Sequence, residues 1–238
     1  MQDIAKAIER ERVYLSYRMK GEEPFHLVDA VKECGFETLD GYFEAKQEYL
    51  ITHLQYDVVE TTPAQAIAEV LNAMTAKKTA VLFADTEYTL VWNGNGSEFN
   101  EDYCRACGIP ILPLQTNGGT IVSTKGDLNI GICVPDEYVS DVRWFLNGFA
   151  KIFRKYTEQA VEVNGNDILV NGFKVLGSSS YRSNGMFTFI TPVSLTEKRE
   201  LIQSICVKHS DKIPAHIDFM DNATLRREVL EWLRAALS

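Results

Sequence analysis

The feature that most constrains the fold is a run of short strand-like segments at residues 162–193, EVNGNDILVNGFKVLGSSSYRSNGMFTFITPV. Asn-Gly pairs at 164–165 and 171–172 interrupt this run, and such pairs are typical of the two-residue turns of β-hairpins. We therefore predict three short strands joined by tight turns. A chain that contains such a run needs helices or a second sheet to cover the apolar face of these strands.

Further strand-like runs precede this region and alternate with helical patterns. TAVLFAD, YTLVWNG, IPILPL and DLNIGICV are rich in β-branched and apolar residues, which predicts strands. TTPAQAIAEVLNAM predicts a helix with Thr62 at its cap, Pro63 in its first turn and Gln65 completing a capping box. FNEDYCRACG predicts a short helix closed by Gly108.

The second half of the chain adds three more helical segments. Apolar residues between positions 142 and 153 recur at helical spacing, which predicts an amphipathic helix packed on a sheet. Two further helices are expected near residues 195–205 and 222–233. Strands in mixed order with helices interspersed predict an α+β fold with a mixed β-sheet flanked by helices, and not a regular parallel one.

Residues 1–60 differ from the rest and predict a helical extension before a larger domain at residues 61–238. This quarter contains seven basic and thirteen acidic residues, a net of −6 out of −9 for the whole chain. The segment LVDAVKECGFETLDGYFEAK has the outline of a helix-turn-helix. Its second helix is acidic, however, and phosphates would repel it, so we predict a packing role.

Composition excludes several classes of function. A net charge of −9 argues against a nucleic-acid partner, since phosphate binding needs a basic face. No run approaches the ~18 apolar residues of a membrane span. The first residues form a charged helical pattern and not a secretory signal, so we expect a cytoplasmic protein. The five cysteines are then expected to be reduced thiols.

Cysteine and histidine pairs provide weak candidates for a site. Cys104 and Cys107 have the spacing of half a zinc site, but no second pair stands at suitable spacing, and we expect one thiol to face the core. His209 and His216 are poorly spaced for one metal, so no metal site of protein side chains is predicted.

Two glycine-bearing segments are better candidates. Gly118 and Gly119, before a β-branched run, would let the backbone approach a ligand closely, and a bulge or a hairpin turn is the alternative. Lys174 follows a hairpin turn in an otherwise uncharged strand, three residues before Gly177. Placed beside an anion it would act as a fixed positive group, whereas an isolated lysine is usually solvated.

Together these segments resemble the superfamily of lipoate–protein ligases, biotin ligases and octanoyltransferases, and lipoate–protein ligase A most closely. GIPILPLQTNGGTIVSTKGDLN, residues 108–129, follows the order of that family's arginine and glycine-loop block. NGNDILVNGFKVLGSSSYR, residues 164–182, follows its lysine block. The matched positions of the second block are Asn166, Asp167, Lys174 and Gly177.

The resemblance implies a class II biotin/lipoate ligase-like fold and an acyl-transfer activity. Such enzymes join a small carboxylic acid, here lipoate or octanoate, to ATP and pass the acyl group from the adenylate to a lysine of a lipoyl-domain acceptor protein. Lys174 would stabilise the charge on carboxylate and phosphate oxygens. Asn166 and Asp167 would help to hold Mg²⁺ with the phosphates, because hard cations prefer oxygen ligands.

Several family positions differ in this chain. The paired arginines fall on Pro113 and Leu114, and the His-Asp pair falls on Ser123 and Thr124. A non-catalytic ligand-binding or regulatory protein of the same fold is therefore the alternative to a ligase or acyltransferase. Relatives that carry the acyl group on a cysteine thioester suggest Cys133 or Cys206, but we expect neither to act in this way.

Overall fold

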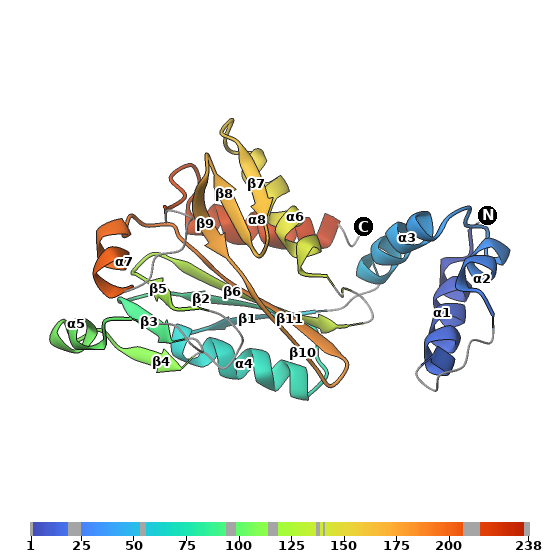
Figure 1. Cartoon of the computed structure of the whole chain (residues 1–238), viewed down its shortest axis with the longest axis horizontal. Coiled ribbons are helices and arrows are strands. Elements are labelled where there is room, and N and C mark those ends of the chain that lie inside the picture. The colour runs from blue at the N-terminus through green and yellow to red at the C-terminus, as the bar shows by residue number, and fades with distance from the viewer. Residues whose placement is uncertain are drawn as a thin grey trace. The chain divides into compact units, whose positions relative to one another are not determined.

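The computed structural model describes residues 2–18, 25–52, 56–93, 99–113, 119–136, 139, 141–206 and 215–235 (Figure 1). The chain divides into two compact units, Met1–Leu54 with Leu233–Ser238, and Gln55–Trp232. The predicted division at residue 60 stays a prediction.

The N-terminal unit is helical, as the sequence predicts. Its helices are α1 (Ile4–Arg18), α2 (Leu27–Glu33) and α3 (Leu39–Thr52). Phe36 and Tyr42 are fully buried and meet edge to face, which gives the α2–α3 region a packing role. The Tyr42 hydroxyl donates to the buried carboxylate of Glu11 at 2.6 Å, and Lys46 pairs with the same carboxylate at 2.5 Å.

The larger unit contains two β-sheets. The first is ordered β1-β2-β6-β11-β9-β8-β7, with β10 pairing only β11, and the second is ordered β4-β3-β5. The strands are β1 (Asp57–Thr61), β2 (Ala80–Asp85), β3 (Leu90–Asn93), β4 (Ile111–Pro113), β5 (Ile121–Ser123), β6 (Leu128–Pro135), β7 (Val161–Asn164), β8 (Asp167–Val170), β9 (Phe173–Gly177), β10 (Ser179–Ser183) and β11 (Met186–Val193).

Both sheets are mixed. β1 runs parallel to β2 and β3 runs parallel to β4, whereas the other pairs are antiparallel. Helices flank the larger sheet (Figure 1), so the predicted α+β class with a mixed sheet is confirmed. The strand β1, within the last residues of the predicted extension, was not expected from the sequence.

The region that predicted three strands contains five, β7 to β11, so that prediction was wrong in number. Asn171 and Gly172 both have positive φ and form the β8–β9 turn, as predicted. The preceding turn lies one residue later than expected, at Gly165 and Asn166, with glycine first and at φ +61°. A third turn, at residues 184–185, joins β10 to β11.

The helices of the larger unit are α4 (Pro63–Thr75), α5 (Glu101–Ala106), α6 (Val142–Arg154), α7 (Arg199–Ile205) and α8 (Asn222–Ala235). α4 packs on one face of the large sheet, while α6 and α8 lie over the other (Figure 1). The predicted amphipathic helix is α6, whose Phe145 stacks on Phe189 of β11 at 4.9 Å. Gly148 leaves room for the Trp232 ring of α8, to which a Cβ would come within 2.1 Å.

Two details of the helix ends differ from expectation. The Thr62 hydroxyl donates to the Gln65 side chain at 3.0 Å and caps no backbone N–H, so the predicted capping box does not form. α7 begins at Arg199 and not at Leu195, and the N–H groups of Leu195 and Thr196, before the helix, donate to the Asp127 carboxylate.

At its end, α6 is tied to α8 by a charged contact. The buried Glu228 carboxylate accepts from Lys155 at 2.8 Å and from the Tyr156 hydroxyl at 2.5 Å. These bonds, led by that of Lys155, lower the pKa of Glu228. Among the helices of the described residues, none is long and apolar enough to cross a lipid bilayer.

Candidate functional site

The β8–β9 hairpin brings together three of the residues predicted for the site. Asp167 lies opposite Gly177 in the register, and the Lys174 ammonium lies 3.1 Å from Asp167 Oδ1. The Lys174 side chain is 35% exposed and that of Asp167 is 15% exposed. The ion pair therefore lies at the surface, and its carboxylate is more buried than its ammonium. The ammonium can therefore reach a ligand without losing its partner.

A β-bulge makes this arrangement possible. Side chains alternate between the faces of a strand, so Lys174 and Gly177, three residues apart, would normally lie on opposite faces. The register shifts between Ile168 and Leu169, which pair with Leu176 and Lys174. The extra residue, Val175, returns Lys174 to the face of Gly177, since a bulge re-aims the side chains beside it.

Gly177 provides the space that the lysine occupies. A Cβ there would lie 2.7 Å from Lys174 Cε, 2.8 Å from its Nζ and 3.2 Å from Asp167 Oδ1. Real Cβ atoms essentially never approach a neighbour as closely as the two distances to Lys174, both below 3.0 Å. Any side chain at position 177 would therefore displace the ammonium from its carboxylate.

Backbone hydrogen bonds hold both ends of the hairpin. The Asn166 carbonyl accepts from the N–H and the hydroxyl of Ser178, at 2.8 and 2.9 Å. The Thr191 hydroxyl of β11 donates to the Gly177 carbonyl at 3.0 Å. The Ala215 N–H donates to the Lys174 carbonyl at 2.9 Å. The backbone on either side of Lys174 is thus held by hydrogen bonds within the hairpin, to β11 and to Ala215.

The other predicted residues are less closely associated. Asn166 is exposed in the β7–β8 turn, beside Asp167. Gly119 is exposed before β5, in the smaller sheet, and among the described residues no hydrogen bond joins it to the hairpin. Gly118 lies outside the described residues. Of the two family arginine positions, Pro113 is exposed at the end of β4 and Leu114 lies outside the described part.

Sequence reasoning missed a buried polar cluster next to the β5–β6 turn. Asp127 is 1% exposed and pairs with the buried Lys198. Thr124, at a family His-Asp position, donates from its N–H to Asp127 at 2.7 Å, and Ser123 donates to Asn129 at 3.4 Å. Asp127 and Lys198 are 71 residues apart, and no local pattern signals that they meet.

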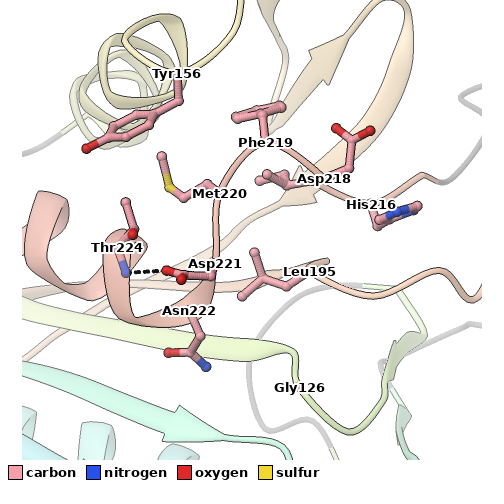
Figure 2. Close-up of a pocket in the computed structure, with 11 residues that line it drawn as sticks. Gly126, Tyr156, Leu195, His216, Asp218, Phe219, Met220, Asp221, Asn222 and Thr224 are labelled. Carbon is pink, nitrogen blue, oxygen red and sulfur yellow. Dashed lines mark hydrogen bonds between the residues drawn. The ribbon is translucent and has the colours of Figure 1, made fainter.

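A surface groove of about 610 Å³ lies beside this turn (Figure 2). Its lining is Gly126, Tyr156, Leu195 and residues 216–222 with Thr224. His216 Nδ1 lies 3.0 Å from a Glu197 carboxylate oxygen, and Asp221 accepts from the Thr224 N–H at the start of α8. A second groove, about 500 Å³, lies near α5. Neither lining includes Lys174, so groove size alone does not identify the hairpin.

The two cysteines considered as acyl carriers, Cys133 and Cys206, do not have the environment of a reactive thiolate. Burial raises the pKa of Cys133 to about 11. Burial, followed by the neighbouring Cys104, raises the pKa of Cys206. Cys104 is buried and Cys107 exposed, which confirms that one thiol of the pair faces the core. No group of three potential metal ligands of the His, Cys, Asp or Glu type occurs within the described ranges.

Solved structures of ligases share this fold. A bipartite lipoate protein ligase of Thermoplasma acidophilum, described with its E2 lipoyl domain, superimposes with a TM-score of 0.65 at 15% identity, over 78% of this chain and 84% of that one. A lipoate–protein ligase A bound with ATP gives 0.61 at 15% identity, over 77% and 85%. LipL1 of P. falciparum in complex with lipoate gives 0.64 at 10% identity, over 76% and 62%.

At these identities the likeness shows the fold alone. A search of curated proteins found no match to this chain. The family model of the lipoyl protein ligase A/B catalytic domain matches residues 58–218, which is more than half of the chain and includes the Lys174 hairpin. The chain therefore belongs to the lipoyl protein ligase A/B catalytic domain family.

Proposed function

We propose that this protein binds a small carboxylic acid of the lipoate or octanoate type and transfers its acyl group to a lysine of a carrier domain. The observation that carries the proposal is the placement of the Lys174 ammonium against Asp167 and over Gly177, within a domain of this family. An ammonium that a carboxylate and the absence of a side chain at Gly177 keep in place suits the carboxylate of such an acid.

In the proposed reaction a carboxylate oxygen attacks the α-phosphorus of ATP and pyrophosphate leaves. The amine of the acceptor lysine then attacks the carbonyl carbon of the acyl-adenylate, and AMP leaves. Lys174 neutralises the negative charge on the carboxylate and the α-phosphate while the first bond forms. Asp167 orients the ammonium from behind at 3.1 Å. Because the lysine side chain is partly exposed, an ion pair of this type contributes about 0.2–1 kcal/mol.

Asn166 and Asp167 suit a role beside the phosphates. Asn166 is exposed at the turn, and Asp167 adds a carboxylate whose Oδ1 already faces Lys174. Oxygen atoms of this kind suit Mg²⁺, which would supply positive charge beside the phosphates of ATP. The cytoplasmic location expected from the sequence stays a prediction.

A second candidate is a protein that binds the acid without adenylating it. Pro113 replaces one of the arginines that the resemblance implies for a nucleotide clamp. Ser123 and Thr124 replace the His-Asp pair, and both form hydrogen bonds inside the protein, to Asn129 and to Asp127. These substitutions favour binding over chemistry, so ATP dependence distinguishes the two candidates.

A ligand screen tests the proposal. Melting temperatures would be measured with octanoate, lipoate, biotin and ATP–Mg²⁺, singly and in pairs, alongside pyrophosphate release. An acid at 100 times its Kd should stabilise the fold by about 2.7 kcal/mol. Lys174→Ala should abolish this shift, whereas Lys151→Ala, at an exposed lysine of α6, should retain it. No shift with any acid would refute the proposal, and a shift without pyrophosphate release would favour the second candidate.

A further inference from the structure

The carboxylate of Asp127 is bonded on both of its oxygens. Oδ2 accepts from the N–H and the hydroxyl of Thr124, at 2.7 and 3.1 Å, and from the Lys198 ammonium. Oδ1 accepts from the Leu195 N–H at 3.0 Å and from the Thr196 N–H at 3.2 Å, and the Thr196 hydroxyl lies 2.9 Å from it. The hydroxyls of Thr124 and Thr196 lie 2.6 Å apart, so one of them donates its proton to the other. The Asp127 carboxylate is therefore buried and bonded on both oxygens.

This cluster joins the β5–β6 turn to the segment that follows β11. Residues 124–127 form the turn between β5 and β6, with Gly126 at φ +97° and a hydrogen bond from the Asp127 N–H to the Thr124 carbonyl at 2.9 Å. β5 begins two residues after Gly119. Residues 195–198 follow the end of β11. The ion pair thus fixes the strand behind the glycine pair to the segment after β11.

From this segment, hydrogen bonds continue to Lys174. The Ser194 N–H donates to the carbonyl of Val175, the bulge residue next to Lys174, at 3.2 Å. The Ser194 carbonyl accepts from the Ile217 N–H at 2.7 Å. Two residues earlier, the Ala215 N–H donates to the Lys174 carbonyl. An unbroken set of backbone contacts therefore runs from the Asp127–Lys198 pair to the bulge that aims Lys174.

Stability alone does not account for such a pair. Desolvation offsets most of the attraction in a buried ion pair, and apolar replacements of similar shape are often equally stable. Burial lowers the pKa of Lys198, while the Asp127 carboxylate acts in the opposite direction. Unlike apolar contacts, the hydrogen bonds of this pair are directional, so they specify how the β5–β6 turn and the segment after β11 pack together.

We infer that Asp127 and Lys198 are positioning residues for the acid-binding site. They hold β5 and the residues after Gly119 in a set relation to the Lys174 bulge. The inference rests on the proposed function, since the site that they position is the one proposed for the acid.

The test compares folding with ligand affinity. The double variant Asp127→Asn/Lys198→Met removes both charges while keeping the side-chain shapes close. Octanoate affinity would be measured by titration calorimetry, and folding by circular dichroism and melting temperature. The matched control is Gly185→Ala, which strains the β10–β11 turn at the end of β11 farthest from its pairing with β9. Coupling through such contacts should weaken octanoate binding about tenfold in the double variant and leave it unchanged in the control.

The outcomes separate the inference from the proposed function. If the wild-type protein binds neither octanoate nor lipoate, the proposed function fails and the inference fails with it. If the wild type binds octanoate and a folded double variant binds it within about twofold, the inference alone is overturned. If the double variant does not fold, the octanoate affinity of Thr124→Val tests the inference instead. Removing that hydroxyl should weaken binding about threefold, and unchanged affinity would overturn the inference.

Discussion

Gly177→Ala should separate ligand binding from folding, because the three atoms nearest its added methyl group belong to the end of the Lys174 side chain and to the Asp167 carboxylate. The new Cβ would lie 2.7 Å from Lys174 Cε, while ordinary contacts begin at 3.4 Å, so the lysine must retreat by about 0.7 Å. Gly177 is not among the glycines with positive φ, so the backbone is not strained by alanine. Unfolding free energy should change by less than about 1 kcal/mol.

Ligand affinity should respond much more strongly than stability. Displacing the ammonium loses a charge-assisted hydrogen bond of about 1.5–3 kcal/mol, which corresponds to a rise of about 10- to 100-fold in Kd for octanoate. Titration calorimetry and urea unfolding on the same preparations measure both quantities. Gly185→Ala is the control, with about 1 kcal/mol of backbone strain and no loss of affinity. Wild-type affinity in Gly177→Ala would refute the role given to the glycine.

Three further predictions concern the fold and its titrating groups. Gly148→Ala places a Cβ 2.1 Å from the Trp232 ring and should destabilise the protein by about 3 kcal/mol in urea unfolding; a change below about 1 kcal/mol would show that the ring can move away. Burial holds the pKa of Cys133 at about 11, so maleimide should label the exposed Cys107 of the native protein first, and equal labelling would contradict this. The lowered pKa of Glu228 contributes stability that is present above the usual glutamate value of 4.5 and is lost as the pH falls through the folded value. The difference in melting temperature between the wild type and Glu228→Gln should therefore decrease as the pH is lowered. A difference that does not change with pH would contradict a lowered pKa of Glu228.

Local patterns predicted much of this structure. The β8–β9 turn needs positive φ at both of its central positions, which few residue pairs tolerate. The Asn171–Gly172 dipeptide was therefore enough to predict where this turn lies. The helical spacing of apolar residues placed α6 almost to the residue. The lysine block placed Asp167, Lys174 and Gly177 together, although the bulge that aligns them left no recognisable mark in the sequence.

Contacts between distant segments could not be predicted in this way. Asp127 follows a turn glycine, and Lys198 lies in a polar segment, so each taken alone has the pattern of a solvated surface residue. Only the fold brings them together. The capping residues Thr62 and Gln65 were placed correctly but bond to each other, since a capping pattern does not specify which partner a hydroxyl selects.

The measurement that tests the central claim most directly is acid-dependent pyrophosphate release from ATP, with octanoate or lipoate, by the wild type, Lys174→Ala and Lys151→Ala. Our account predicts release that depends on the acid, that is retained in Lys151→Ala and that is lost in Lys174→Ala. Equal release with and without acid, or full release by Lys174→Ala, would contradict the assignment of Lys174 as the group that holds the carboxylate.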